Sequence, residues 1–340
     1  MGFFGGGISG GPFLPVWGAT GGVHIVTKPI RVGVAGAGVF GGHHSAKIAA
    51  HDQASLAGVF DVDPARAEAM ADRFKVSCFT DYAALIEAVD AIIVAAPASV
   101  HYDLAYEALA AGRHVFIEKP IALETADADA LILLARGNGA VLQIGHQERY
   151  VAEAAGLLSI GKSPVKIDCV RRTGASGRCE DVSVVLDLMV HDLDLVRKLT
   201  NADIESVTAN GDAHDAKAEL TLTNGALVNL EASRRADAPE RRMTLVYDDG
   251  IIEFDFVNRT AANTTGAALH ADFDADEAPP AFRDPLGFGA SAFIDAVMHL
   301  REPIVTGEDG RDALDWARRI ENAAGIGLAE EFETTERLRA

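Results

Sequence analysis

Three side chains in the sequence, Lys119, Asp187 and His191, are suited to holding and moving a proton. Asp187 and His191 are four positions apart in a segment with helical periodicity, and side chains at that separation share one face of a helix. A carboxylate beside an imidazole stabilises the imidazolium form, which suits a general base near neutral pH. A desolvated lysine can lower the pKa of a substrate hydroxyl, as removal of a hydride from an alcohol requires.

Both patterns also have a purely structural interpretation. The tripeptide Glu118-Lys119-Pro120 follows an apolar run, and an ordinary surface turn has the same composition. The segment Val182 to Leu199 reads as a helix on which Asp187, His191 and Asp194 share a face that could point to solvent. Ion pairs of this kind are common on helix surfaces, so the local pattern alone favours the surface ion pair.

A glycine motif early in the chain predicts a nucleotide site. The run Gly36-Ala37-Gly38-Val39-Phe40-Gly41 matches G-x-G-x-x-G between a predicted strand and a predicted helix. In such a turn Gly36 permits the tight bend, Gly38 allows backbone approach to a pyrophosphate, and Gly41 allows the helix to pack on the strand. The helix N-terminus, at Val39 and Phe40, offers N–H groups to the phosphate.

Asp61 ends the next apolar run, about 20 residues beyond the last glycine. A carboxylate at that place accepts hydrogen bonds from the ribose 2′-OH and repels a 2′-phosphate, so we expect NAD rather than NADP. Two alternatives stay open. Asp63 could be the working acid, with Asp61 a turn residue, and the domain could bind a flavin or an adenylate instead.

The elements between residues 30 and 145 alternate short apolar runs with helical patterns, which indicates βαβ units and a doubly wound parallel sheet. The expected strands are Arg31 to Ala35, Ser55 to Phe60, Ala91 to Ala95, His114 to Ile117 and Val141 to Ile144. The expected helices include Pro64 to Phe74, Val100 to Ala111 and Glu124 to Arg136. In such a sheet Lys119 lies at the carboxyl edge of a strand, where ligands bind.

Beyond Arg149 the strands lengthen and alternate, which predicts an α+β domain on a mostly antiparallel sheet. Asn224-Gly225 predicts a hairpin turn between two alternating runs. These runs and two further expected strands are Ala218 to Leu222, Ala226 to Ala232, Met243 to Tyr247 and Ile251 to Phe256. Helical periodicity returns at 288–300 and 309–328, and the polar stretch 262–280 predicts a loop.

Composition excludes several classes of protein. The formal net charge of -20 argues against a nucleic-acid partner, because such binding depends on clustered Lys and Arg. The three cysteines form no C-x-x-C pair, which suits a reducing, cytoplasmic compartment and offers no zinc site, so we expect no metal. The sequence contains no apolar run of the roughly 18 residues that a membrane span needs.

We divide the 340 residues into two domains and a tail. Residues 1–28 are glycine-rich without the charged start of a signal peptide, which indicates a disordered tail or a start codon placed upstream of Val26. Residues 29–148 form the expected NAD-binding domain. Residues 149–330 form the expected domain for substrate binding and oligomerisation.

The glycine motif, Glu118-Lys119-Pro120 and Asp187-x-x-x-His191-x-x-Asp194 together resemble the glucose-fructose oxidoreductase, inositol dehydrogenase and rhizopine catabolism family. The resemblance extends from about residue 30 to 325 and implies a Rossmann domain, NAD and a sugar substrate. It assigns catalysis to Lys119, Asp187 and His191, and cofactor contacts to the segments containing Ala96, Pro97, His101 and Glu118. It also implies a homodimer or homotetramer formed through the C-terminal sheet.

A narrower resemblance links 145–150 and 185–194 to UDP-N-acetylglucosamine 3-dehydrogenases, which supply a 3-keto sugar for amination in lipid A precursor synthesis. The sequence departs from that pattern at residues 150–152, where Phe-Asn-Pro would be expected. A sugar diphosphate needs cations, and the arginines that cluster around the expected site are Arg149, Arg171, Arg172 and Arg178. Two of these four could equally be surface arginines, and we favour Arg149 and then Arg172. The alternatives are an inositol or free-sugar dehydrogenase and, in a different class, a non-catalytic NAD-binding regulator.

Overall fold

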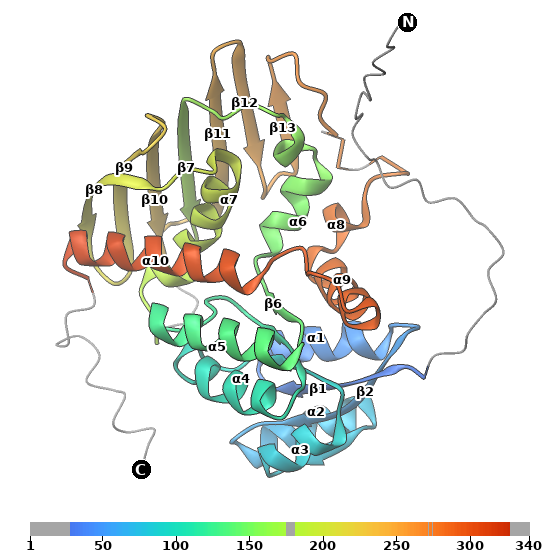
Figure 1. Ribbon diagram of the computed structural model, residues 1–340. Helices are drawn as coiled ribbons and strands as arrows, with labels where there is room; N and C mark the ends of the chain where they lie inside the picture. Colours follow the sequence, from blue (N-terminus) through green and yellow to red (C-terminus); the bar gives the residue numbers. More distant parts are fainter. Residues whose placement is uncertain (1–27, 175–180, 271, 274, 327–340) are drawn as a thin grey trace, which may run out of the picture.

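The computed structural model describes residues 28–174, 181–270, 272–273 and 275–326. The expectation for residues 1–28 falls almost wholly outside the described residues. Two β-sheets form the frame of the molecule, and Figure 1 shows the seven-stranded sheet at the top and the six-stranded sheet at the bottom. Among the described residues, no helix combines the length and apolar character needed to cross a membrane.

The first sheet is parallel throughout, with the strand order β3-β2-β1-β4-β5-β6. Its strands are β1 (Ile30–Ala35), β2 (Ala54–Phe60), β3 (Ser77–Phe79), β4 (Ala91–Val94), β5 (His114–Ile117) and β6 (Leu142–Ile144). This order reverses between β1 and β4, and the carboxyl ends of the strands at such a reversal form a nucleotide crevice. The predicted doubly wound sheet is confirmed. The edge strand β3 was missed because three residues are too few to show a period.

Helices cover both faces of the first sheet, which explains why β4 is buried along its whole length. The helices that follow its strands are α1 (Val39–Ala49), α2 (Pro64–Phe74), α3 (Tyr82–Ala88), α4 (His101–Ala110) and α5 (Thr125–Asn138). One apolar cluster joins α3, α4 and α5 to the sheet, and another joins α1, α2 and the later helix α9 (Pro285–His299) to the other face. The helix predicted from Val100 begins at His101, after the short 3₁₀ turn η1 (Ala98–Val100).

The second sheet has the order β13-β12-β11-β7-β10-β9-β8, and only β7 and β10 pair in parallel. Its strands are β7 (Lys166–Arg172), β8 (Ile204–Gly211), β9 (Asp215–Leu222), β10 (Leu227–Ser233), β11 (Glu240–Tyr247), β12 (Gly250–Asp255) and β13 (Thr260–Asn263). The predicted mostly antiparallel sheet is confirmed. Gly225 takes a φ of +84° in the predicted β9–β10 turn. β13 occupies the start of the expected loop at 262–280.

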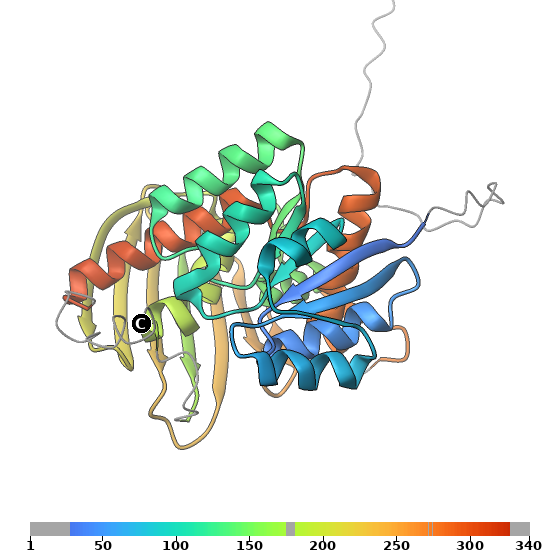
Figure 2. The same ribbon diagram turned by 90° about the horizontal axis from the view of Figure 1, so that it is seen from below.

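Several helices connect the two sheets: α6 (Gln147–Ala154), the π-helical turn η3 (Val185–Met189), α7 (Val190–Thr200), α8 (Pro280–Arg283) and α10 (Gly307–Ala324). The remaining short element is the 3₁₀ turn η2 (Leu157–Ser159). Helix α10 runs between α7 and α5 in Figure 1, and Figure 2 shows it extending from β6 to β8. In the sequence, all strands of the first sheet precede residue 148 and all strands of the second sheet follow it. Helix α9 comes after the second sheet in the chain but packs back onto the first sheet.

Candidate active site

The glycine turn between β1 and α1 has the geometry of a phosphate cradle. Gly36 has a φ of +106°, and a Cβ there would lie 2.5 Å from the Ala95 carbonyl oxygen. A Cβ on Gly41 would lie 1.8 Å from the Gly36 carbonyl oxygen, whereas one on Gly38 would meet nothing within 4 Å among the described residues. Gly36 and Gly41 are therefore required by the fold, and Gly38 leaves open space over the N-terminus of α1, where a phosphate can approach.

Asp61 lies beside this turn at the end of β2. Its Oδ2 accepts a hydrogen bond of 2.7 Å from the Ala37 N–H, and its Oδ1 accepts one of 2.9 Å from the Asp63 N–H. Asp63 instead caps α2 and contacts Arg66 at 2.9 Å. This geometry favours Asp61 over Asp63 as the ribose ligand, because Asp63 is already engaged by its own helix.

His101 joins two loops at the carboxyl edge of the first sheet. Its Nδ1 lies 2.7 Å from the Pro120 carbonyl oxygen and its Nε2 lies 2.9 Å from the Ala96 carbonyl oxygen. Burial lowers the pKa of His101, although both carbonyl contacts oppose that shift. The ring is only 1% exposed, so His101 positions the Ala96-Pro97 segment and the residues after β5 rather than presenting a surface to a ligand.

Glu118 is also held from within the fold. Its Oε1 lies 2.7 Å from Nε2 of His44, which is fully buried in α1. Burial alone would raise the pKa of Glu118, but the hydrogen bond from His44 and the charge on Lys119 leave it below its usual range. The pair ties the end of β5 to the cofactor helix and so fixes the backbone that carries Lys119.

Lys119 reaches across from the first sheet to the second domain. Its Nζ donates to Oδ1 of Asp187 at 2.8 Å and to the Asp187 carbonyl oxygen at 2.7 Å. The other carboxylate oxygen of Asp187 accepts from Arg234 Nε at 3.1 Å. Burial would raise the pKa of Asp187, but the charges on Lys119 and Arg234 hold it below its usual value. The structure therefore joins two of the predicted catalytic residues directly.

The carboxylate in contact with His191 is Glu148, not Asp187. His191 Nδ1 lies 2.8 Å from Glu148 Oε2, and Glu148 Oε1 accepts from Arg171 at 2.7 Å. Burial would raise the pKa of Glu148, but the charges on His191 and Arg171 keep it well below its ordinary range. Because Glu148 contacts Nδ1, Nε2 is the ring nitrogen of His191 that is left to face a ligand.

His191 contacts Glu148 and not Asp187 because of the π-helical turn η3, which contains Asp187 and ends just before α7. In a π-helix the i→i+5 bonding widens the turn, so residues four apart no longer stack as they do on an α-helix. Asp187 is thereby directed to Lys119, and His191 to Glu148 in α6.

A second imidazole lies next to His191. The rings of His146 and His191 meet edge to face with centroids 5.9 Å apart. His146 is 1% exposed, and neither ring nitrogen has a hydrogen-bond partner among the described residues. Burial lowers the pKa of His146 to about 4, so the ring is neutral at pH 7 and packs as an uncharged wall beside His191.

The two arginines expected to bind phosphate lie elsewhere. Arg149 is 2% exposed; its Nε donates to Asp194 at 3.0 Å, and it lies 3.5 Å from Asp309. Arg172 contacts Glu231 and Glu240, both at 2.9 Å, on the face of β7 opposite to Arg171. Alternate residues of a strand point to opposite faces, so Arg172 cannot share the site that contains Arg171.

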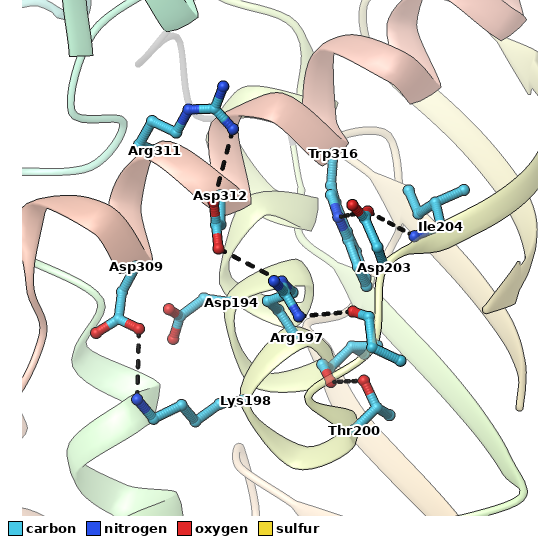
Figure 3. Close-up of polar contacts among 12 residues, drawn as sticks. Asp194, Arg197, Lys198, Thr200, Asp203, Ile204, Asp309, Arg311, Asp312 and Trp316 are labelled. Atoms are coloured by element: carbon cyan, nitrogen blue, oxygen red, sulfur yellow. Dashed lines mark hydrogen bonds and ion pairs between the residues drawn. The ribbon is translucent and has the colours of Figure 1, made fainter. Parts of the chain in front are cut away.

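Arg149 belongs instead to the polar seam between α7 and α10. Figure 3 shows this seam, in which Lys198 contacts Asp309 and Arg197 contacts Asp312. Asp309 also completes the capping box of α10 with Thr306. The contact of Arg149 with Asp194 and Asp309 therefore holds these two helices against α6.

Sequence reasoning missed Glu148 and Arg234 as residues of the site, and it ranked Arg149 and Arg172 above the neighbouring candidate Arg171. Glu148 and Arg171 stand next to the chosen Arg149 and Arg172, one position away in each case. A predicted strand over 166–172 would have placed Arg171 and Arg172 on opposite faces, but it could not have shown which face carries the site.

The chain combines a parallel nucleotide-binding sheet with a mostly antiparallel sheet. A lysine that follows a strand of the first sheet contacts an aspartate in the part of the chain that contains the second. This arrangement defines a two-domain NAD-dependent oxidoreductase. The family model described as "Oxidoreductase family, NAD-binding Rossmann fold" matches residues 30–146, and the GFO/IDH/MocA C-terminal domain matches 175–253. The chain belongs to the Gfo/Idh/MocA oxidoreductase family.

Its relatives act on sugars and inositols. The chain is 36% identical over 305 residues to UDP-N-acetylglucosamine 3-dehydrogenase of Acidithiobacillus ferrooxidans, covering 86% of this chain and 96% of the relative. A structure of that enzyme superposes with a TM-score of 0.80, covering 88% of this chain and 98% of the other. Myo-inositol 2-dehydrogenase of Thermotoga maritima is 28% identical, with 84% of this chain and 93% of the relative covered. The protein is thus a dehydrogenase of CH–OH groups.

Proposed function

We propose that this protein oxidises the C3 hydroxyl of UDP-N-acetylglucosamine with NAD to give the 3-keto sugar. The observation that carries the enzymatic part is the contact between Lys119 and Asp187, which brings a lysine of the NAD domain into the second domain beside His191. The substrate is supported by the 36% identity to a UDP-N-acetylglucosamine 3-dehydrogenase over nearly its full length.

The chain's own residues divide the chemistry as follows. Lys119 donates to the substrate hydroxyl and favours its ionised form, while Asp187 and Arg234 hold the ammonium group in place. His191 accepts the hydroxyl proton at Nε2, because Glu148 engages Nδ1. The turn at Gly36, Gly38 and Gly41 and the Asp61 carboxylate would hold the NAD phosphates and ribose. When bound, NAD supplies the acceptor for the hydride that leaves the carbon.

The proposal extends to setting and assembly. We propose that the enzyme acts in the cytoplasm and provides a keto sugar for amination, as the resemblance to lipid A precursor enzymes implies. The described cysteines Cys78 and Cys169 are free, in keeping with a reducing compartment. We also propose a homodimer or homotetramer formed through the face of the second sheet that carries Arg172, opposite to the face that carries Arg171.

Oxidation of an inositol is the second candidate, because inositol dehydrogenases are also among the relatives. Such a substrate carries no phosphate. A non-catalytic NAD-binding regulator is disfavoured, since Lys119, Asp187 and His191 are all present and Lys119 contacts Asp187.

The deciding experiment is a spectrophotometric assay of NADH formation with UDP-N-acetylglucosamine, myo-inositol and free hexoses. A 3-aminotransferase is added to remove a keto product, which draws an unfavourable oxidation forward. We expect NADH with UDP-N-acetylglucosamine, and none from the Lys119→Ala variant. Turnover of myo-inositol alone would overturn the substrate, and NAD binding without turnover of any sugar would support the regulator.

A further inference from the structure

A sugar diphosphate needs a cation at this site, and the nearest buried cations are already engaged. Lys119 and Arg234 contact Asp187, while Arg171 contacts Glu148 and Asp192. The side chains of Arg171 and Arg234 are 3% and 8% exposed, so neither can turn toward a ligand. The formal net charge of -20 makes a local cation more necessary, because the protein as a whole repels an anion.

Among the residues that the structure describes, Arg241 is the cation at this site that remains available. It lies on β11 directly opposite Arg171 on β7, and strand alternation puts it on the face whose next residues, Met243 and Leu245, are buried. Its side chain is 48% exposed. Its one polar side-chain contact among the described residues is the approach of its guanidinium to Glu148 Oε1, at 3.8 Å. That distance is too long for a hydrogen bond, so its donors are free for a ligand.

The position of Arg241 fits one part of the substrate. Arg241 approaches one oxygen of the Glu148 carboxylate, and His191 contacts the other at 2.8 Å. The guanidinium and the imidazole are therefore separated by little more than one carboxylate group. An anion bound to Arg241 would lie within the length of a sugar phosphate from the carbon whose hydroxyl meets His191.

We propose that Arg241 forms the subsite for the phosphate or diphosphate of the sugar substrate and so distinguishes phosphorylated sugars from free ones. The inference rests on the proposed function, because it assigns Arg241 to the phosphate group of the substrate proposed there. A guanidinium binds phosphate oxygens through two parallel hydrogen bonds, which the half-exposed Arg241 side chain can provide.

The test compares Arg241→Ala with Arg242→Ala. Arg242 is a matched control, since it is the next residue, is 51% exposed and contacts Glu240 at 2.9 Å on the opposite face. We expect Arg241→Ala to raise the KM for UDP-N-acetylglucosamine roughly 10- to 100-fold with kcat nearly unchanged. We expect Arg241→Lys to recover part of the loss, and Arg242→Ala to match the wild type.

Calorimetric titration with UDP provides a readout that does not depend on turnover. We expect the wild type and Arg242→Ala to bind UDP, and Arg241→Ala to bind it at least ~10-fold more weakly. Equal UDP affinity in Arg241→Ala and wild type, or no UDP binding by the wild type, would overturn the subsite. A wild type that binds UDP through Arg241 but oxidises only inositol would retain the subsite and refute the proposed substrate, so the two failures are distinguishable.

Discussion

His191 Nδ1 lies 2.8 Å from Oε2 of Glu148, a residue 43 positions earlier in the chain and on a different helix. The Glu148 carboxylate is itself held by Arg171 at 2.7 Å. The buried carboxylate orients the proposed base, and the guanidinium fixes the carboxylate in turn. The imidazole therefore has one ring nitrogen left to face the substrate. Glu148 is therefore a positioning residue for the proposed base, and this role can be tested.

Glu148→Gln should lower kcat/KM roughly 10- to 100-fold while the melting temperature stays close to that of the wild type. The glutamine keeps the size of the side chain but removes the negative charge that favours the protonated imidazole. The measurement is kcat/KM from pH 5 to 9, with thermal melting as a check on folding. A fall in melting temperature that accounts for the loss of activity would mean that Glu148 supports only the fold.

Lys119→Met should reduce kcat at least ~100-fold while NAD affinity stays within a few fold of the wild type. Methionine preserves the length of the side chain and removes the ammonium group that donates a hydrogen bond to Asp187 Oδ1 at 2.8 Å. Stopped-flow turnover and fluorescence titration with NADH measure the two quantities. Lys217→Ala, on a strand of the second sheet, is the control. An equal loss of turnover and of NAD affinity would contradict a role in the chemical step.

Asp61→Ala should lower kcat/KM for NAD roughly 10- to 100-fold and narrow the preference for NAD over NADP, because it removes an acceptor for the ribose hydroxyl and a repulsive charge. Initial rates with both cofactors measure the change. Asp63→Ala is the control, since it removes the cap of α2 and should leave cofactor preference unchanged. The reverse pattern would make Asp63 the ribose ligand.

His146 should make the free energy of unfolding depend on pH, and this dependence should extend to pH values above those at which carboxylates titrate. Burial lowers the pKa of His146 to about 4, whereas an unfolded histidine titrates near 6.5. Between these two pH values His146 is protonated in the unfolded chain and neutral in the native chain. The free energy of unfolding therefore falls as the pH falls. The expected loss from this residue between pH 7 and pH 5 is about 2 kcal/mol.

Urea unfolding at pH 7 and pH 5 measures this loss, and His146→Phe should show a smaller difference between the two pH values than the wild type. Other buried histidines, such as His101, have pKa values lowered by burial and remain in both proteins, so the variant isolates the share of His146. An identical pH dependence in the two proteins would show that His146 is solvated in the native state.

The local sequence determined much of this protein. Short apolar runs and alternating runs predicted most strands of both sheets, although not β3, β7, β8 or β13. Asn224-Gly225 predicted the β9–β10 turn, because backbone preferences act over a few residues. The glycine motif predicted a turn whose crowding the structure shows at Gly36 and Gly41. The likeness to the Gfo/Idh/MocA family is also confirmed.

Tertiary structure alone decided which charges meet. Asp187 contacts Lys119 and His191 contacts Glu148 because a π-helical turn rotates the segment that was expected to be a regular helix. Arg149 is buried against Asp194, while Arg241 stays half exposed beside Glu148. Ion pairs form wherever the packing of distant elements brings opposite charges together. The spacing of residues along the chain does not determine how α6, η3 and β11 pack against one another.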